Sequence, residues 1–197
     1  MSVNKTQEKL IESGLTLLLQ HGFTASGISR IVGAAGVPKG SFYHFFPGGK
    51  EAFALAVIER YHQRATRARA EMLLARDPAP LVRLRQHFAG FADSMRGAGF
   101  RQGCLLGNLS AEIADQMPSV RAALQAAFSA WADDVASVLT EARTAGTIAE
   151  NLQPETLARA MIASWEGALL LMKAHQSDAS LVDFQRLWFD TVLVPPG

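Results

Sequence analysis

Cysteine and long hydrophobic runs are what this sequence lacks most plainly. Cys104 is the single cysteine of the 197-residue chain, so an intramolecular disulfide is excluded and the chain alone cannot build a thiolate metal site. No apolar stretch approaches the length of a membrane span, and the amino-terminal residues lack the basic, apolar and small-residue segments of a secretory leader. The sequence therefore predicts a cytoplasmic protein with no membrane partner.

The composition is that of a packed helical protein. Hydrophobic residues make up 49% of the chain and charged residues 19%, and alanine and leucine, which favour helix, are abundant. No strand pattern, internal repeat or low-complexity segment interrupts this composition. We therefore expect an all-α fold with a sizeable core.

The charge is unevenly distributed along the chain. Residues 1–76 carry ten Lys and Arg against five acidic residues, whereas residues 77–197 carry nine against thirteen. A basic amino-terminal part is expected if that part meets phosphates. The alternative is that its arginines merely solvate a helix face. The arginines concerned are Arg60, Arg64, Arg67 and Arg69.

Three short helices are predicted at the amino terminus. Apolar residues recur at helical spacing over residues 5–20, and His21-Gly22 ends that helix. Ser26 is a suitable N-cap for a second helix, which Gly36 ends. Pro38 suits the first turn of a third helix, before Pro47 and two glycines break it. Three helices with a tight glycine turn between the last two outline a helix-turn-helix domain.

Longer helices are expected in the rest of the chain, separated by Gly and Pro punctuation. Their expected ranges are 50–76, 80–97, 103–116, 118–145, 154–175 and 180–193.

The third helix has residues suited to reading DNA, because its amino-terminal end is the part of such a motif that enters the major groove. Lys39 can reach a phosphate or a guanine edge, and Gly40 lets the backbone approach closely. Hydroxyl and imidazole groups nearby can donate to phosphate oxygens, and a lysine opening the next helix can hold the DNA backbone from the other side. The candidate DNA contacts are Ser26, Lys39, Gly40, Ser41, Tyr43, His44 and Lys50.

This segment resembles the helix-turn-helix of the TetR family of bacterial regulators over about residues 5–55. The matching residues, in order, are Ile31-Val32, Ala35-Gly36-Val37, Lys39-Gly40, Tyr43, Phe46 and Lys50-Glu51. The chain departs from the family pattern at Pro38, in place of a capping serine, at Gly27, and at Gly48-Gly49, which add a residue before Lys50.

The resemblance implies a DNA-binding domain at residues 1–49 and a helical ligand-sensing and dimerisation domain at residues 50–197. It implies a repressor that binds a palindromic operator in double-stranded DNA as a homodimer and is released by a small-molecule inducer or an electrophile.

Two wide apolar stripes in the last two helices predict an interface between two copies of the chain. Part of each stripe has the alternative explanation of an intrachain core. Dimerisation is favoured because a two-fold reader of DNA needs two recognition helices at a fixed spacing. The candidate interface residues are Leu169, Met172, Phe184, Leu187 and Trp188.

Ligand contacts are expected among aromatic residues, although core packing is the alternative for most of them. The aromatic candidates are Phe88, Phe91, Trp131 and Trp165. The stretch from Arg101 to Glu112 resembles the branch of the family with N-ethylmaleimide-responsive and acrylate-responsive regulators, in which a cysteine at this place senses electrophiles and oxidants.

Cys104 and Asn108 lie on a small, polar face of the helix expected there. That face either lines a cavity or lets two helices pack closely, and both interpretations stay open. A helix starting near Gly103 would place the thiol in its first turn, where the helix dipole and Arg101 favour the reactive thiolate. The alternative is that Cys104 is a small buried hydrophobe.

Two rival functions remain. One is a cysteine-dependent helical enzyme with Cys104 as nucleophile, and the other is a helical adaptor that does not bind DNA. The five histidines show neither a His-Glu-x-x-His motif nor a Cys-His arrangement, and an adaptor leaves the ordered residues 35–46 unexplained. We therefore expect a non-enzyme with no catalytic residue, no metal and no cofactor.

Overall fold

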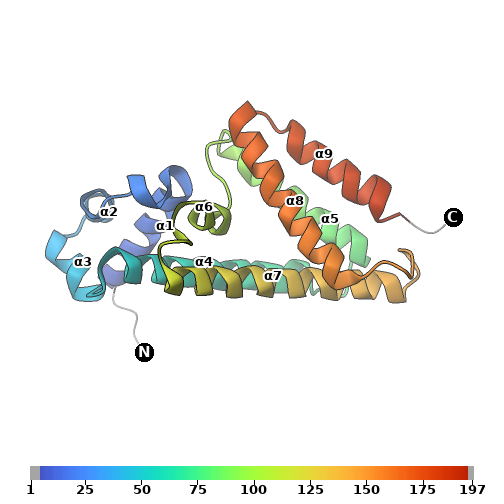
Figure 1. Ribbon diagram of the computed structural model, residues 1–197, viewed down its shortest axis with the longest axis horizontal. Helices are drawn as coiled ribbons and strands as arrows, with labels where there is room; N and C mark the ends of the chain where they lie inside the picture. The colour runs from blue at the N-terminus through green and yellow to red at the C-terminus, as the bar shows by residue number, and fades with distance from the viewer. Residues whose placement is uncertain (1–4, 195–197) are drawn as a thin grey trace. The chain divides into compact units, whose positions relative to one another are not determined.

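The computed structural model describes residues 5–194, and every regular element in that range is a helix (Figure 1). The elements are α1 (Lys5–Ala25), α2 (Ile28–Ala35), α3 (Lys39–Phe45), α4 (Gly49–Met72), α5 (Pro80–Gly97), α6 (Leu105–Ile113), α7 (Pro118–Thr144), α8 (Pro154–His175), α9 (Ala179–Leu187) and the π-helical turn η1 (Trp188–Val192). The predicted all-α fold is confirmed. None of the described helices is long and apolar enough to cross a membrane.

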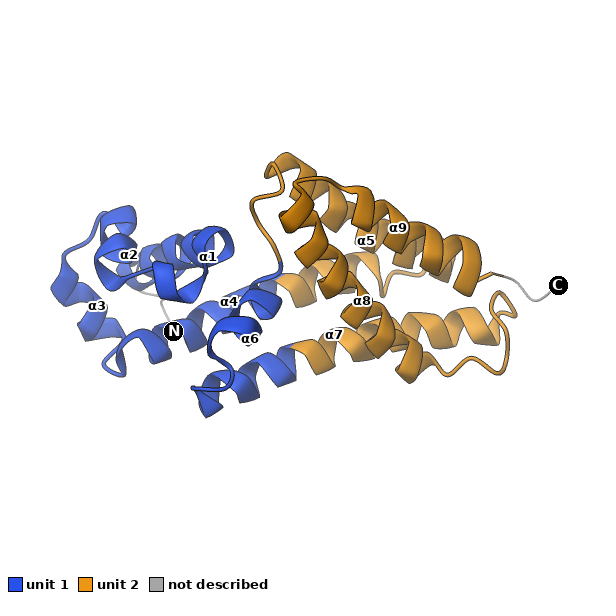
Figure 2. Ribbon diagram, turned by 45° about the horizontal axis from the view of Figure 1, so that its top comes forward, with its two compact units in different colours: residues 1–64, 104–127 blue, residues 65–103, 128–197 orange. Residues whose placement is uncertain are grey.

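The chain divides into two compact units, which Figure 2 colours separately. Unit 1 holds residues 1–64 and 104–127, and unit 2 holds residues 65–103 and 128–197. Helices α4 and α7 each contribute one part to unit 1 and the other to unit 2. The compact units therefore divide the chain differently from the functional division expected after residue 49, which stays a prediction.

Unit 1 is built around aromatic and aliphatic side chains of its first four helices. Phe42 of α3 and Phe53 of α4 are fully buried, with their ring centroids 5.2 Å apart. Phe46 closes the group, at 5.4 Å from Phe42 and 5.1 Å from Phe53. A Cβ at Gly14 of α1 would overlap the Phe53 ring, so this glycine lets α1 approach α4 closely.

The glycine turn between α2 and α3 has the predicted left-handed geometry. Gly36 has φ 65° and ψ 37°, and its N–H donates to the Gly33 carbonyl. The N–H of Val37 donates to the Val32 carbonyl, which completes a Schellman motif. A non-glycine residue would be strained at this position, so the sequence signal at Gly36 is confirmed by its backbone.

Several helix boundaries differ from those expected, including both ends of α6, and three of the differences have a local structural reason. Helix α1 continues to Ala25 across a break at Gly22, where φ is 74° and ψ is −178°. Helix α4 ends at Met72 because the N–H groups of Leu73 and Leu74 both donate to the Arg69 carbonyl. At the carboxyl end, α9 gives way at Trp188 to the π-helical turn, which a period of 3.6 residues does not anticipate.

Candidate DNA-reading and sensing sites

Helix α3 presents its predicted DNA contacts on the outside. Lys39, Gly40 and His44 are exposed, and Tyr43 is 49% exposed. Ser41 is partly exposed. The buried ring of Phe42 anchors the other side of the helix in unit 1. Among the described residues, Lys39 makes no hydrogen bond or ion pair within 5–194, so its ammonium group is available to an external anion.

Ser26 has a structural role. Its side chain is fully buried, and its hydroxyl donates to the Gly22 carbonyl over 2.6 Å. The N-cap of α2 is Gly27, without a side-chain capping hydrogen bond. The prediction that Ser26 caps the second helix is therefore wrong. We also remove Ser26 from the candidate DNA contacts, because its hydroxyl is buried and already used.

Lys50 also points inward. Its Nζ donates to the Phe23 carbonyl and lies 4.0 Å from the centroid of the Phe23 ring. Burial lowers the pKa of Lys50, and the negative charge of Glu112 offsets part of that shift. The expectation of an outward contact to the DNA backbone is corrected to an internal one, because the carbonyl and the ring hold the ammonium group.

Glu112 is a residue whose role the sequence did not reveal. Its two carboxylate oxygens accept hydrogen bonds from the backbone N–H groups of Phe23, at 3.0 Å, and Thr24, at 2.9 Å. The adjacent Gly22 has a positive φ, and a Cβ there would overlap the Glu112 carboxylate. Glu112 of α6 therefore holds the turn that leads into α2. The partners are 89 and 88 residues away along the chain, so no local pattern indicates them.

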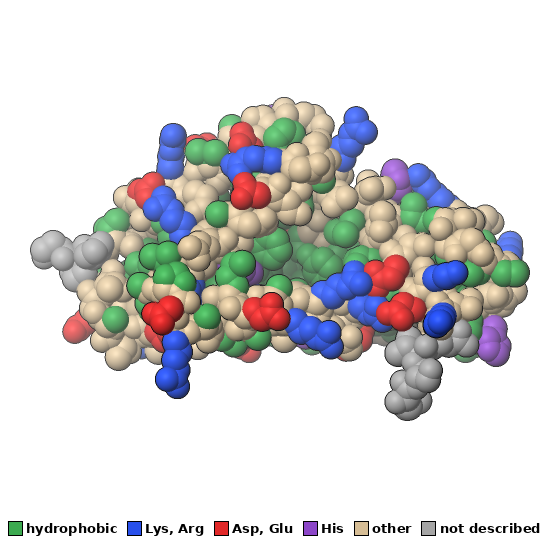
Figure 3. All heavy atoms as spheres, turned by 180° about the vertical axis from the view of Figure 1, so that it is seen from behind, with side chains coloured by type: hydrophobic (Ala, Val, Ile, Leu, Met, Phe, Trp, Pro, Cys, Tyr) green, Lys and Arg blue, Asp and Glu red, His purple; other side chains and the backbone are tan. Residues whose placement is uncertain are grey.

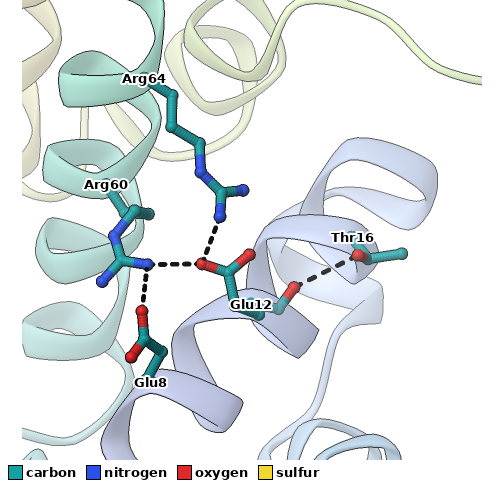
Figure 4. Close-up of polar contacts among 5 residues, drawn as sticks. All are labelled: Glu8, Glu12, Thr16, Arg60 and Arg64. Atoms are coloured by element: carbon teal, nitrogen blue, oxygen red, sulfur yellow. Dashed lines mark hydrogen bonds and ion pairs between the residues drawn. The ribbon is translucent and has the colours of Figure 1, made fainter.

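The basic residues of α4 are largely paired with acids. Figure 4 shows Arg60 between Glu8 and Glu12 of α1, at 3.0 and 2.6 Å, and Arg64 at 2.7 Å from Glu12. Further along α4, the nearly buried Arg69 lies 2.6 Å from Asp134, within unit 2. Acidic and basic side chains are likewise intermixed on the face shown in Figure 3. These arginines therefore join helices, a role that neither predicted alternative included.

Cys104 is the N-cap of α6 and is only 8% exposed. The sequence predicted this thiol within the first turn of a helix starting near Gly103, but α6 begins at Leu105, so Cys104 lies just before that turn. Its sulfur lies 3.9 Å from the Tyr61 hydroxyl, and its carbonyl accepts a hydrogen bond from the N–H of Asn108 at 3.0 Å. The two candidate sensor residues are thus joined at the start of α6 by this backbone hydrogen bond.

The four aromatic ligand candidates come together in unit 2. The ring of Phe88 lies 5.2 Å from Trp165 and 6.1 Å from Trp131. Phe91 lies 5.9 Å from Trp131 and 6.1 Å from Trp165. Phe184 joins the group at 4.9 Å from Phe88, so one predicted interface residue belongs to this cluster. We call these five residues, together with His87, the aromatic cluster.

His87 is the polar member of the aromatic cluster. The indole N–H of Trp131 donates to its Nε2 over 3.1 Å, so the imidazole is held as a neutral acceptor. Burial lowers the pKa of His87 to about 3, and the positive charge of Arg69 is the second cause. The sequence analysis did not predict this role of His87. The one signal for it in the sequence is that His87 directly precedes Phe88 on the same helix.

Most of the predicted interface residues are core residues of the chain. Leu169, Met172, Phe184 and Trp188 are between 0 and 6% exposed, because α8 and α9 pack their widest apolar faces on unit 2 itself. The prediction that these four residues contact a partner chain is corrected accordingly. Leu187 is 51% exposed, and it is joined on α8 by Leu170 and Leu171, at 66 and 51%. These three leucines are the large apolar side chains of α8 and α9 that stay exposed in the described part of the chain, and they are available to a second chain.

Comparison with known proteins agrees with this architecture. Residues 10–57 match the model of bacterial regulatory proteins of the tetR family, and residues 80–188 match the tetracyclin repressor-like C-terminal domain. The chain belongs to the TetR family. It is thereby a transcriptional regulator of the helix-turn-helix class, as its sequence predicted.

Three relatives within the TetR family match nearly the whole chain. The repressor DhaR of Mycobacterium sp. (strain GP1) is 33% identical over 98% of this chain and 95% of its own. The transcriptional regulator AcuR of Cereibacter sphaeroides is 37% identical over 91% of this chain and 81% of its own. The repressor NemR of Escherichia coli K12 is 35% identical over 87% of this chain and 86% of its own.

A crystal structure of reduced E. coli NemR superposes with a TM-score of 0.89 at 29% identity, covering 98% of this chain and 100% of that one. All three relatives are named as regulators of transcription.

Proposed function

We propose that this TetR-family protein is a ligand-responsive repressor that binds a palindromic operator as a homodimer and leaves it when a small molecule or an electrophile binds. The observation that carries the DNA-binding part is the outward face of α3. Lys39, Gly40, Tyr43 and His44 are exposed there, over the buried Phe42.

The chemistry of this face suits a major groove. Gly40 has open space around it, so the backbone can come close to a phosphate or a base edge. The unpaired ammonium group of Lys39 supplies a charge that the paired Arg60 and Arg64 do not.

The surface of Leu170, Leu171 and Leu187 supports dimerisation. Three large apolar side chains, each at least half exposed, are costly in water and gain free energy when a second copy covers them. A two-fold axis through α8 and α9 would repeat this surface on both chains and fix the distance between two α3 helices.

Two features support a sensing role for the rest of the chain. In unit 2, the aromatic cluster brings the four predicted ligand residues together around one neutral imidazole, and these apolar surroundings suit an uncharged ligand. In unit 1, Cys104 is the N-cap of α6, and Glu112 near the other end of that helix holds the turn before α2. A ligand or modification that displaced α6 would therefore also disturb the turn before α2.

The test of the DNA-binding proposal is a gel shift on operator-containing genomic fragments with Lys39→Ala. We expect a loss of about 1–3 kcal/mol if Lys39 reads a base, or a salt slope reduced by about one if it contacts a phosphate. The exposed Lys9 of α1 provides a matched control, and Lys9→Ala should bind like the wild type. If folded Lys39→Ala and Tyr43→Phe both keep the affinity and salt slope of the wild type, the assignment of α3 fails.

A further inference from the structure

Unit 2 contains a groove of about 550 Å³ between α5 and the end of α9 with η1. Its apolar walls are Leu81, Val82 and Ala89 on one side and Phe189 and Leu193 on the other. We propose that this groove binds an uncharged small molecule with an apolar body and one hydrogen-bonding group. The proposal concerns binding at a second place in unit 2 and does not depend on the proposed DNA-binding function.

The groove is distinct from the aromatic cluster and from the surface of exposed leucines. None of the residues that line it belongs to the cluster. On α9, Gln185 lies two residues before Leu187, which is about 200° around an α-helix, and Phe189 lies beyond α9 in η1. A second copy of the chain seated on Leu187 would therefore leave the groove open.

The π-helical turn η1 shapes one wall. The N–H of Leu193 donates to the Trp188 carbonyl at 2.8 Å, five residues back, so the backbone is wider here than in an α-helix. Phe189 lies within this turn and Leu193 directly follows it, and both line the groove. Single π-helical turns are uncommon and are often found at functional sites.

The charge at the groove is balanced, which favours a neutral occupant. Arg85 lines the groove, but its guanidinium group lies 2.7 Å from the Asp190 carboxylate. It also lies over the ring of Phe189, at 5.6 Å from the centroid. An anionic ligand would compete with Asp190 for Arg85, and a cationic one would meet the guanidinium. An uncharged ligand avoids both costs.

Gln185 provides the hydrogen-bonding chemistry. The oxygen and the nitrogen of its side-chain amide are both buried, and neither has a hydrogen-bond partner among the described residues 5–194. A buried amide without partners is unfavourable. A small turn of this side chain towards a bound hydroxyl or carbonyl group would therefore gain the free energy of a hydrogen bond. Gln86 lines the same groove and offers a second amide.

The size of the groove fits a small molecule. Small-molecule sites typically enclose about 300–1,000 Å³ and combine apolar walls with a few placed polar groups. The walls named above, with Gln86 and Gln185 as the polar groups, match that description.

The experiment measures binding of the neutral fluorescent probe N-phenyl-1-naphthylamine to the full-length protein. We expect saturable binding at one site per chain. Ala89→Phe should fill the groove and Val82→Arg should put a charge at its mouth, each weakening the site at least tenfold. Leu74 is 45% exposed, as Val82 is, but lies outside the groove, so Leu74→Arg is the matched control and should bind as the wild type does.

Absence of saturable binding to the wild type would overturn the proposal. So would wild-type affinity in both Ala89→Phe and Val82→Arg, because the probe would then bind elsewhere. Unchanged circular dichroism and thermal unfolding in these variants separate loss of the groove from loss of the fold.

Displacement of the probe by benzyl alcohol and by toluene tests the polar end, because the two differ by one hydroxyl group. We expect Gln185→Leu to lower the preference for benzyl alcohol over toluene about fivefold relative to the wild type, the equivalent of one hydrogen bond. An unchanged preference would refute the role of Gln185.

Discussion

The carboxylate of Glu112 accepts a hydrogen bond of 3.0 Å from the backbone N–H of Phe23. With the second bond to Thr24, this side chain satisfies two donors of the turn between α1 and α2. The turn is also held from the other side, by Lys50 at the Phe23 carbonyl and ring. The start of the helix-turn-helix is thus fixed by residues outside the segment of 1–49.

Replacing Glu112 by glutamine removes the charge and one of the two acceptors. Hydrogen bonds to charged groups contribute about 1.5–3 kcal/mol, so we expect Glu112→Gln to lower the free energy of unfolding by about 1–2 kcal/mol. Urea unfolding of the variant and the wild type measures this difference in the free energy of unfolding. Glu150→Gln, at an exposed position, serves as the control and should unfold like the wild type. Equal midpoints for both variants would show that the contact adds nothing.

Gly22→Ala should be costly for two reasons. The backbone at φ 74° and ψ −178° is a conformation that only glycine adopts readily, and the new Cβ would overlap the Glu112 carboxylate. We expect a loss of about 1–3 kcal/mol in unfolding free energy. Gly33 of α2 has open space and no positive φ, so Gly33→Ala should instead stabilise by about 0.5–1 kcal/mol. Thermal unfolding of the two variants should therefore move in opposite directions.

The low pKa of His87 predicts a loss of stability in mild acid. The folded state holds this imidazole neutral down to a pKa of about 3, whereas the unfolded chain takes up the proton near pH 6.5. The unfolded state thus binds more protons between these values, and stability falls as the pH drops below about 6.5.

From pH 7.5 to pH 5.0, this histidine should cost about 2 kcal/mol, because each pKa unit is worth about 1.4 kcal/mol. His87→Asn should reduce the dependence, whereas His175→Gln, at an exposed position, should keep it. Urea unfolding at both pH values provides the measurement, and identical pH dependence in all three proteins would contradict the assignment.

The exposed leucines predict a dimer that one charge can dissociate. A glutamate at Leu187 or Leu170 would be buried without a partner in a two-fold interface, which costs several kcal/mol. Sedimentation should show wild-type dimers and variant monomers, with operator affinity lost in parallel. Met72 is 40% exposed on α4, away from that surface, and Met72→Glu should stay dimeric. A monomeric wild type at working concentration would end the proposal.

Covalent sensing through Cys104 predicts operator release by N-ethylmaleimide. The thiol is 8% exposed beside the Tyr61 hydroxyl, so an added maleimide ring would have to displace the start of α6. We expect the electrophile and a mild oxidant to release wild-type protein, and Cys104→Ser to stay bound. Equal release from both proteins, or from neither, would leave Cys104 as a packing residue.

The helices and the glycine turn could be predicted from local signals. Gly36 is an example, because a left-handed residue after an apolar helix is a property of the residue itself. The predicted outward face of α3 follows in the same way from its spacing around Phe42. In unit 2, the aromatic candidates lie together because large apolar rings at helical spacing pack into one core.

Long-range partners could not be predicted. Lys50 has the same sequence context whether it points to DNA or to Phe23, and Glu112 gives no sign of a partner 89 residues away. The stripes of α8 and α9 were wide enough to face both a core and a partner, so the sequence could not separate Leu169, at 5% exposed, from Leu170, at 66%. Ser26 was misplaced because its hydroxyl bonds backwards to Gly22 rather than forwards into α2.

The aromatic residues also determine which parts of this protein can be followed by its intrinsic absorbance and fluorescence. Its three tryptophans, Trp131, Trp165 and Trp188, all lie in unit 2, and its two tyrosines, Tyr43 and Tyr61, both lie in unit 1. Tyr43 stands on α3 and Tyr61 beside Cys104, whereas the indole N–H groups of Trp131 and Trp188 donate to His87 and Ser164. Indole emission therefore reports on unit 2, whereas phenol absorbance reports on α3 and on the surroundings of the thiol in unit 1.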